Sequence, residues 1–186
     1  MFRGQTAPTP LIINGEPVFM SSYAVMGAEM IDPGQRTRPC SLVPIPYSLS
    51  RFPDWQSRLG AYLNTRAAMP FRYGSMDCGL FVAGAIETMT GVDVAAELRG
   101  YRNRTEAFTR IRNVCGRRNM AAIADHLAAQ FSIPEVPVLC AQRGDAVQCR
   151  TGRLGIVAMH GTEILTPYKD GLLRLPLVHA VRAWHI

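Results

Sequence analysis

The sequence has few of the features that would attach the protein to a membrane or send it out of the cell. None of its apolar runs approaches the ~20 residues that a membrane-spanning helix needs. Its first ten residues, MFRGQTAPTP, lack the apolar stretch of a signal peptide. A hydrophobic share of 48% over 186 residues is sufficient for one domain with a proper core. We therefore expect a soluble protein with no membrane span, which is cytoplasmic when it is synthesised.

The spacing of the cysteines does not indicate a disulfide framework. Five of them are scattered along the chain without a CxxC pair, at positions 40, 78, 115, 140 and 149. Such an odd, widely spaced set argues against a disulfide scaffold and a structural zinc site, so we expect reduced thiols and no metal or cofactor. Four of the five are interpreted as small buried side chains or loop residues. Cys78 differs from them by its position.

The sequence is positively charged but lacks the motifs typical of nucleic-acid-binding proteins. Lysine and arginine number 20 against 14 acidic residues, and the net charge is +6. Arginines cluster between residues 99 and 118, but neither a glycine-rich phosphate loop nor an RNA-stacking motif accompanies them. We therefore expect a solvated basic helical face and no sequence-specific binding of nucleic acid.

Residues 1–50 differ in composition from the rest of the chain. They contain spaced prolines and a DPG turn, with little sustained periodicity. Within them, Asn14-Gly15 favours a hairpin turn between the short apolar pieces Leu11–Ile13 and Pro17–Met20. We expect an N-terminal arm over 1–50 and a folded domain over 51–186.

Within that domain, helical patterns come first and strand patterns follow. Apolar residues at helical spacing predict helices from 54 to the stop at Pro70, and over 77–90, 93–99, 104–114 and 119–131. Short β-like runs follow at 145–149, 154–159, 163–166, 172–175 and 181–185. This order predicts an α+β fold, with the helices packed on an antiparallel sheet.

Cys78 falls in the first turn of the second expected helix, directly after Asp77. A cysteine there lies at the positive end of the helix dipole, among unpaired backbone N–H groups that favour the thiolate. The same N–H groups can stabilise an oxyanion on an attacked carbonyl. From these residues alone, a nucleophile and a buried cysteine without chemistry are equally open.

A thiolate nucleophile normally needs a general base, most often a histidine. The chain offers four histidines, at positions 126, 160, 179 and 185. His160 is the best candidate because it ends the strand pattern LGIVAM, on the sheet that should face the helix.

The segment PFRYGSMDCGLFV resembles the PYxWGG…DCSGLV segment of NlpC-type cysteine peptidases, a papain-like family that cleaves amide bonds in cell-wall peptides. Arg143–Val147 resembles the GDLV strand of that family, and Arg153–Val157 resembles its HVGIY strand. The resemblance is greatest to phage and prophage members found among tail genes. It implies a papain-like NlpC-type fold, with N-terminal helices on a C-terminal antiparallel sheet. It also implies a peptidoglycan stem peptide or other phage tail proteins as partners.

The resemblance also assigns roles to residues. Cys78 matches the nucleophile, Asp77 the acidic residue before it, and Tyr73 the aromatic stretch that lines the site. Arg153 occupies the position of the catalytic histidine, and arginine stays protonated, so it cannot act as a base. His160 is an odd number of residues away and would face the other side of a regular strand unless a bulge brings it round. We expect Cys78 and His160 to be catalytic, and Tyr73, Asp77 and Arg153 to bind substrate.

Three functions are compatible with the sequence. The favoured one is a phage-type cell-wall peptide hydrolase, a cysteine peptidase or amidase with Cys78 as nucleophile. The second is a non-catalytic tail or tail-assembly component that retains the papain-like fold. Arg153 favours this second function, which would place the protein in the virion tail. The third is a cysteine acyltransferase or a thiol-dependent binding module.

Overall fold

The computed structural model describes residues 11–13, 16–18 and 49–186. The chain divides into two compact units, Met1–Arg38 and Pro39–Ile186. In the first unit, β1 (Leu11–Ile13) pairs antiparallel with β2 (Glu16–Val18), which confirms the expected strand pair. The turn at 14–15 and the rest of the expected arm lie outside the described residues. The division of the chain after residue 50 stays a prediction.

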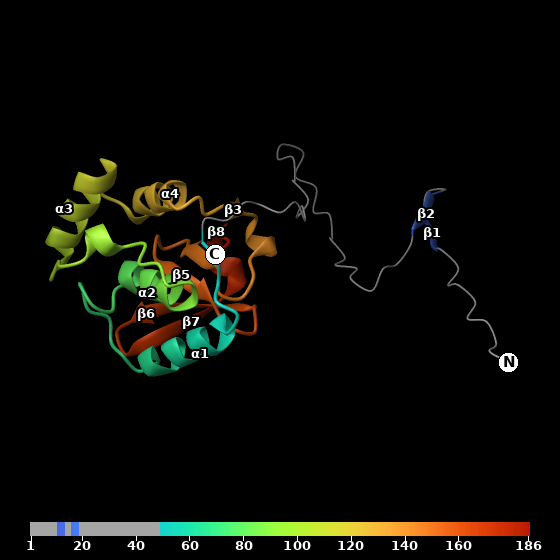
Figure 1. Cartoon of the computed structure of the whole chain (residues 1–186), viewed down its shortest axis with the longest axis horizontal. Helices are drawn as coiled ribbons and strands as arrows, with labels where there is room; N and C mark the ends of the chain where they lie inside the picture. The colour runs from blue at the N-terminus through green and yellow to red at the C-terminus, as the bar shows by residue number, and fades with distance from the viewer. Residues whose placement is uncertain (1–10, 14–15, 19–48) are drawn as a thin grey trace. The chain divides into compact units, whose positions relative to one another are not determined.

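The second unit begins with two helices that pack against each other, α1 (Trp55–Arg66) and α2 (Cys78–Thr90). α2 also packs on the sheet, against β5 and β6 (Figure 1). A single 3₁₀ turn, η1 (Ala96–Leu98), replaces the helix expected over 93–99. It leads to α3 (Arg104–Cys115) and α4 (Met120–Gln130), which contact each other.

A six-stranded antiparallel sheet follows, with strand order β3-β8-β4-β5-β6-β7. Its strands are β3 (Glu135–Val136), β4 (Ala146–Cys149), β5 (Leu154–Val157), β6 (Glu163–Tyr168), β7 (Gly171–Pro176) and β8 (Ala180–Trp184). Two further 3₁₀ turns are η2 (Val138–Cys140) and η3 (Leu177–His179). The α+β class expected from the sequence is therefore confirmed. Within the described residues, none of the helices is long and apolar enough to pass through a bilayer.

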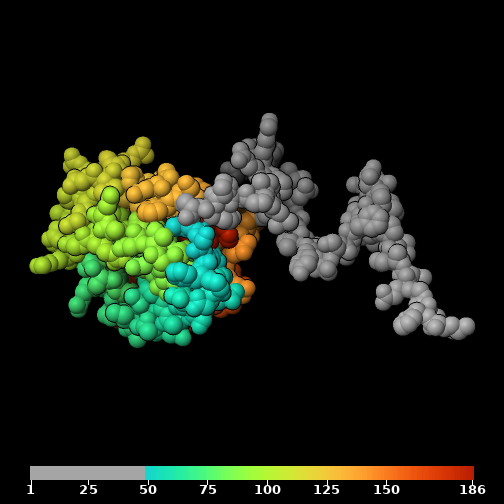
Figure 2. Space-filling model, viewed as in Figure 1, coloured from blue at the N-terminus to red at the C-terminus, as the bar shows by residue number. Residues whose placement is uncertain are grey.

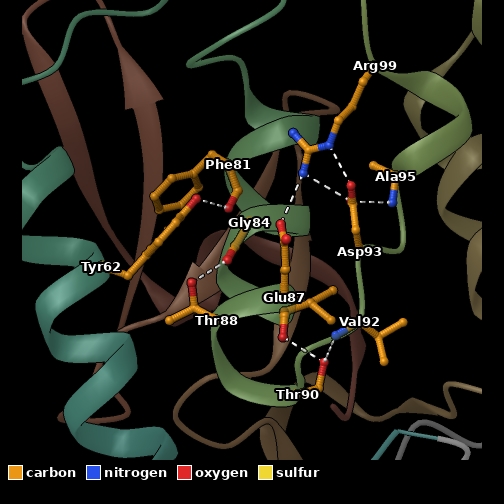
Figure 3. A network of polar contacts seen from close by, with 11 residues as sticks. Tyr62, Phe81, Gly84, Glu87, Thr88, Thr90, Val92, Asp93, Ala95 and Arg99 are labelled. Carbon is orange, nitrogen blue, oxygen red and sulfur yellow. Dashed lines mark hydrogen bonds and ion pairs between the residues drawn. The ribbon is translucent and has the colours of Figure 1, made fainter.

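α2 forms the centre of the core. It is buried on most sides and ends at Gly91, whose φ of 81° is easily adopted only by glycine. The Tyr62 hydroxyl of α1 donates to the carbonyl of Phe81, and Arg99 pairs with Glu87 of α2 and with Asp93 (Figure 3). These contacts fix α2 against α1 and against the segment that leads to α3.

α4 is tied to the edge of the sheet by one arginine. The Arg182 guanidinium of β8 contacts Asp125 of α4 and Glu135 of β3, each at 2.6 Å, and stacks on the Trp184 ring at 4.7 Å. The two carboxylates raise the pKa of Arg182 well above its ordinary value. α4 is therefore held to the sheet by polar contacts at this edge.

Candidate functional site

Cys78 is the first residue of α2, and its side chain is half-buried. The helix begins there because Asp77 adopts an extended backbone and its carboxylate accepts from the N–H groups of Gly79 and Leu80, each at 3.1 Å. The expected helix start at Asp77-Cys78 is thus confirmed, and the thiol occupies the first turn.

The Asp77 carboxylate also fixes the loop before the helix. Its second oxygen accepts from the Gly74 N–H at 2.9 Å and from the Tyr101 hydroxyl at 2.8 Å. Gly74 has a φ of 80°, and a Cβ there would lie 1.9 Å from the Tyr101 carbonyl oxygen, so only glycine fits. Both oxygens of the buried Asp77 are therefore engaged by the protein itself.

The Cys78 sulfur faces the beginning of β5. The backbone N–H of Leu154 is directed at it, and the Arg153 guanidinium lies close enough to favour its charged form. The Arg153 guanidinium is held over the Tyr168 ring at 4.8 Å. Cys78 and Arg153, which are distant in the sequence, therefore line the same cavity in the fold.

Burial is the largest influence on the thiol and raises the pKa of Cys78 above its ordinary value. The Leu154 N–H and Arg153 lower this pKa, whereas the negative charge of Asp77 raises it further. The helix dipole alone favours the opposite direction, and the sequence does not show how much solvent the fold removes from around the sulfur. Burial therefore favours the neutral thiol.

The thiol lines a cavity of about 690 Å³ between α2, α3, α4 and the sheet. Tyr73, Asp77 and Arg153 line the same cavity, so the structure brings together four of the five expected site residues. The lining residues that are exposed to solvent are Arg104, Thr151, Tyr168 and Lys169. Its size is within the range of about 300–1,000 Å³ typical of small-molecule sites.

His160 lies elsewhere. It is exposed in the turn between β5 and β6, where its ring contacts the Thr162 hydroxyl at 3.0 Å and the Glu163 carboxylate at 3.2 Å. β5 keeps regular pairing with β4 and β6, without a bulge that would redirect the chain. His160 is not among the residues that line the Cys78 cavity.

Asp145 and His185 form a carboxylate–imidazole pair that does not line the cavity. Trp184 and Ile186 line the cavity, and His185 between them points away from it, with Nδ1 2.9 Å from Asp145. Asp145 is fully buried and also binds Arg51 at 2.8 Å and the Gln142 N–H. This pair therefore joins the start of the domain to its last strand. None of the four histidines, all of which are described, lines the cavity.

The remaining cysteines include one correction. Cys115 and Cys149 are free thiols, as expected, but Cys140 is disulfide-bonded, so the expectation of a reduced thiol is wrong there. Cys149 is buried in β4, and burial raises its pKa. Within the described residues, no three histidine, cysteine or acidic side chains gather as a metal site requires.

Three residues of the site were missed by the sequence reasoning. Tyr101 positions Asp77, and Arg104 and Lys169 line the cavity. Tyr101 and Arg104 come from the segment that enters α3 and Lys169 from the β6–β7 turn, and no local pattern connects them to Cys78. Only the tertiary arrangement of these two segments brings them to the cavity of Cys78.

Comparison with family models assigns the domain to a family. The model of a family described as "Domain of unknown function (DUF6950)" matches residues 50–186. A search of curated proteins finds none that matches the chain.

Proposed function

The chain belongs to the DUF6950 family, and we propose that its domain is a papain-like scaffold that binds a ligand beside Cys78 without hydrolysing it. The protein then serves as a component of a phage tail or of tail assembly. The papain-like fold and the tail assignment are supported by the sequence resemblance around PFRYGSMDCGLFV and by the α+β architecture.

The observation that carries this proposal is that the Arg153 guanidinium lines the same cavity as the Cys78 thiol and lies close enough to favour its charged form. Amide hydrolysis by cysteine needs a group that accepts the thiol proton and later donates it to the leaving amine. Arginine stays protonated at any ordinary pH and cannot do either. Among residues 49–186, Asp77 supplies the acidic side chain on the cavity wall, and its carboxylate is already occupied by four hydrogen bonds.

A cell-wall peptide hydrolase is the second candidate, and a different observation favours it. The Leu154 N–H and the N–H of Cys78 itself are directed at the sulfur, as stabilisation of a thiolate requires. In this reaction Cys78 would attack the amide carbon, release the amine and form a thioester that water cleaves. His160 could act as the base only after leaving its contacts with Thr162 and Glu163.

Incubation of the purified protein with peptidoglycan stem peptides separates the two candidates. We expect no product from the wild type, so that it equals Cys78→Ala. Product formation by the wild type that Cys78→Ala abolishes would establish the hydrolase and refute the proposal.

A second experiment introduces a base at position 153 and tests whether this residue acts on the Cys78 thiol. Arg153→His places an imidazole beside the thiol, and we expect it to lower the pH at which Cys78 is half-alkylated relative to Arg153→Gln. The Gln variant removes a charge that favours the thiolate, so its half-point should lie above that of the wild type. Identical alkylation profiles for the three proteins would show that residue 153 does not act on the thiol.

A further inference from the structure

We propose that the ligand of the Cys78 cavity is an amphipathic anion with one long hydrocarbon chain, of the chemical class of a free fatty acid. This inference rests on the proposed binding function and names the class of its ligand. Three properties of the cavity support it: its walls, its charge and its size.

The walls of the cavity are predominantly apolar. Aliphatic side chains reach it from three helices, including Val82 and Ile86 of α2, Ile111 of α3, and Ile123 and Leu127 of α4. A peptide placed against these walls would lose hydration of its amide groups without gaining partners, which is unfavourable. A hydrocarbon chain has no polar groups to satisfy, and it gains from leaving water.

Three of the four charged side chains on the cavity wall are cationic. The charged side chains on the wall are Asp77, Arg104, Arg153 and Lys169, and Asp77 is engaged internally. Within residues 49–186, none of the three cations forms an ion pair with an acidic side chain. Two of them are stacked on rings instead, Arg153 on Tyr168 at 4.8 Å and Arg104 on Phe108 at 5.6 Å. Three cations beside an apolar interior complement a carboxylate head on a hydrocarbon tail.

The size of the cavity favours a long tail over a short one. A volume of about 690 Å³ exceeds what a small anion such as acetate fills. Each methylene group that enters an apolar site raises affinity by about fourfold. Affinity should therefore increase with chain length until the tail fills the cavity.

Calorimetric titration of the full chain tests the proposal with defined probes. Decanoate, below its micellar concentration, is expected to bind once per chain with a dissociation constant on the order of micromolar. We expect 1-decanol, which lacks the carboxylate, to bind at least tenfold more weakly and acetate to give no heat. The heat capacity change should be negative because apolar surface is buried. Absence of decanoate binding, or equal affinities for decanoate and decanol, would overturn the proposal.

Two variants of one helix provide a matched control. Ala124 lines the cavity, whereas Ala129 lies on the exposed face of α4. Ala124→Phe puts a ring into the cavity and should weaken decanoate binding at least tenfold, while Ala129→Phe should leave it within twofold. If Ala124→Phe binds as the wild type does, the ligand lies elsewhere and the proposal fails. A dimer that Ala124→Phe dissociates would make a second copy of the chain the occupant, and would also overturn it.

The outcomes separate this inference from the function on which it rests. Decanoate binding together with stem-peptide hydrolysis that requires Cys78 would refute the non-hydrolytic function and leave the ligand class intact. Failure to bind decanoate without any hydrolysis would refute the ligand class and leave the non-hydrolytic function intact.

Discussion

Asp77 is the residue whose replacement should disturb the site most. Its carboxylate caps α2 through Gly79 and Leu80 and holds the preceding loop through Gly74 and Tyr101. We expect Asp77→Ala to lower the free energy of unfolding by about 3–5 kcal/mol. The lost cap accounts for about 1 kcal/mol, and the two donors left buried without a partner account for about 1–3 kcal/mol each, not fully additive.

Two other substitutions separate the contribution of the helix cap to stability from that of the loop contacts. Asp77→Asn keeps one acceptor oxygen for the helix cap but presents an amide group to the Gly74 N–H, so we expect a loss of about 2 kcal/mol. Tyr101→Phe removes a single hydrogen bond to a charged acceptor and should cost about 1.5–3 kcal/mol. Asp170→Ala, at an exposed position in the β6–β7 turn, is the control and should stay within about 0.5 kcal/mol.

Urea unfolding followed by circular dichroism measures these differences. The linear extrapolation gives the free energy in water for each variant, and equal slopes confirm that the transitions are comparable. A loss below about 1 kcal/mol for Asp77→Ala would contradict the four-bond role of the carboxylate. So would an equal loss for Tyr101→Phe and Asp77→Ala, because the cap would then contribute nothing.

Three further predictions concern the core. Gly84→Ala should destabilise the protein by about 1–3 kcal/mol, since its Cβ would lie 2.5 Å from the Tyr62 hydroxyl. In a Tyr62→Phe background the loss should be smaller, and thermal unfolding of both pairs of proteins measures the difference. Burial raises the pKa of Tyr62 to about 12, so the folded state favours the neutral phenol. The contribution of Tyr62 to stability is complete below the unfolded pKa of 10 and falls as pH rises above it, by about 1.4 kcal/mol at pH 11. A Tyr62→Phe variant that shows the same decline in unfolding free energy would contradict this. Asp145→Ala should lower the free energy of unfolding in urea by about 3–5 kcal/mol because it removes the carboxylate that Arg51 and His185 share. A loss below about 1 kcal/mol would show that these three residues do not stabilise the fold as a unit.

Local signals in the sequence were sufficient to predict much of the fold. Asp77 and Gly91 set the two ends of α2 by capping, which depends only on residues within a few positions. β3 was missed because two residues carry no periodicity, and it exists only by pairing with β8. The expected helix over 93–99 became a 3₁₀ turn in a segment where Asp93 and Glu87 both pair with Arg99.

The candidate site was predictable only in part. The resemblance matched Arg153 to the position of the catalytic histidine but left open whether Arg153, His160 or neither approaches Cys78. The direction of the thiol pKa did not follow, because it depends on how much water β5 and the helices exclude from the sulfur. The cavity could not be predicted from the sequence either, because its walls come from segments that are distant in the sequence and meet only in the folded structure.

The contact of Arg182 with Asp125 and Glu135 has a consequence for the wall of the cavity. α4 is fastened to the sheet there by charges that lie 2.6 Å apart, well inside the Debye length of about 8 Å at physiological ionic strength. Ordinary salt should therefore leave this contact largely intact, and only concentrations on the order of 1 M, where the Debye length falls to about 3 Å, should weaken it. The helix that forms one wall of the cavity is thus anchored at a point remote from the Cys78 thiol.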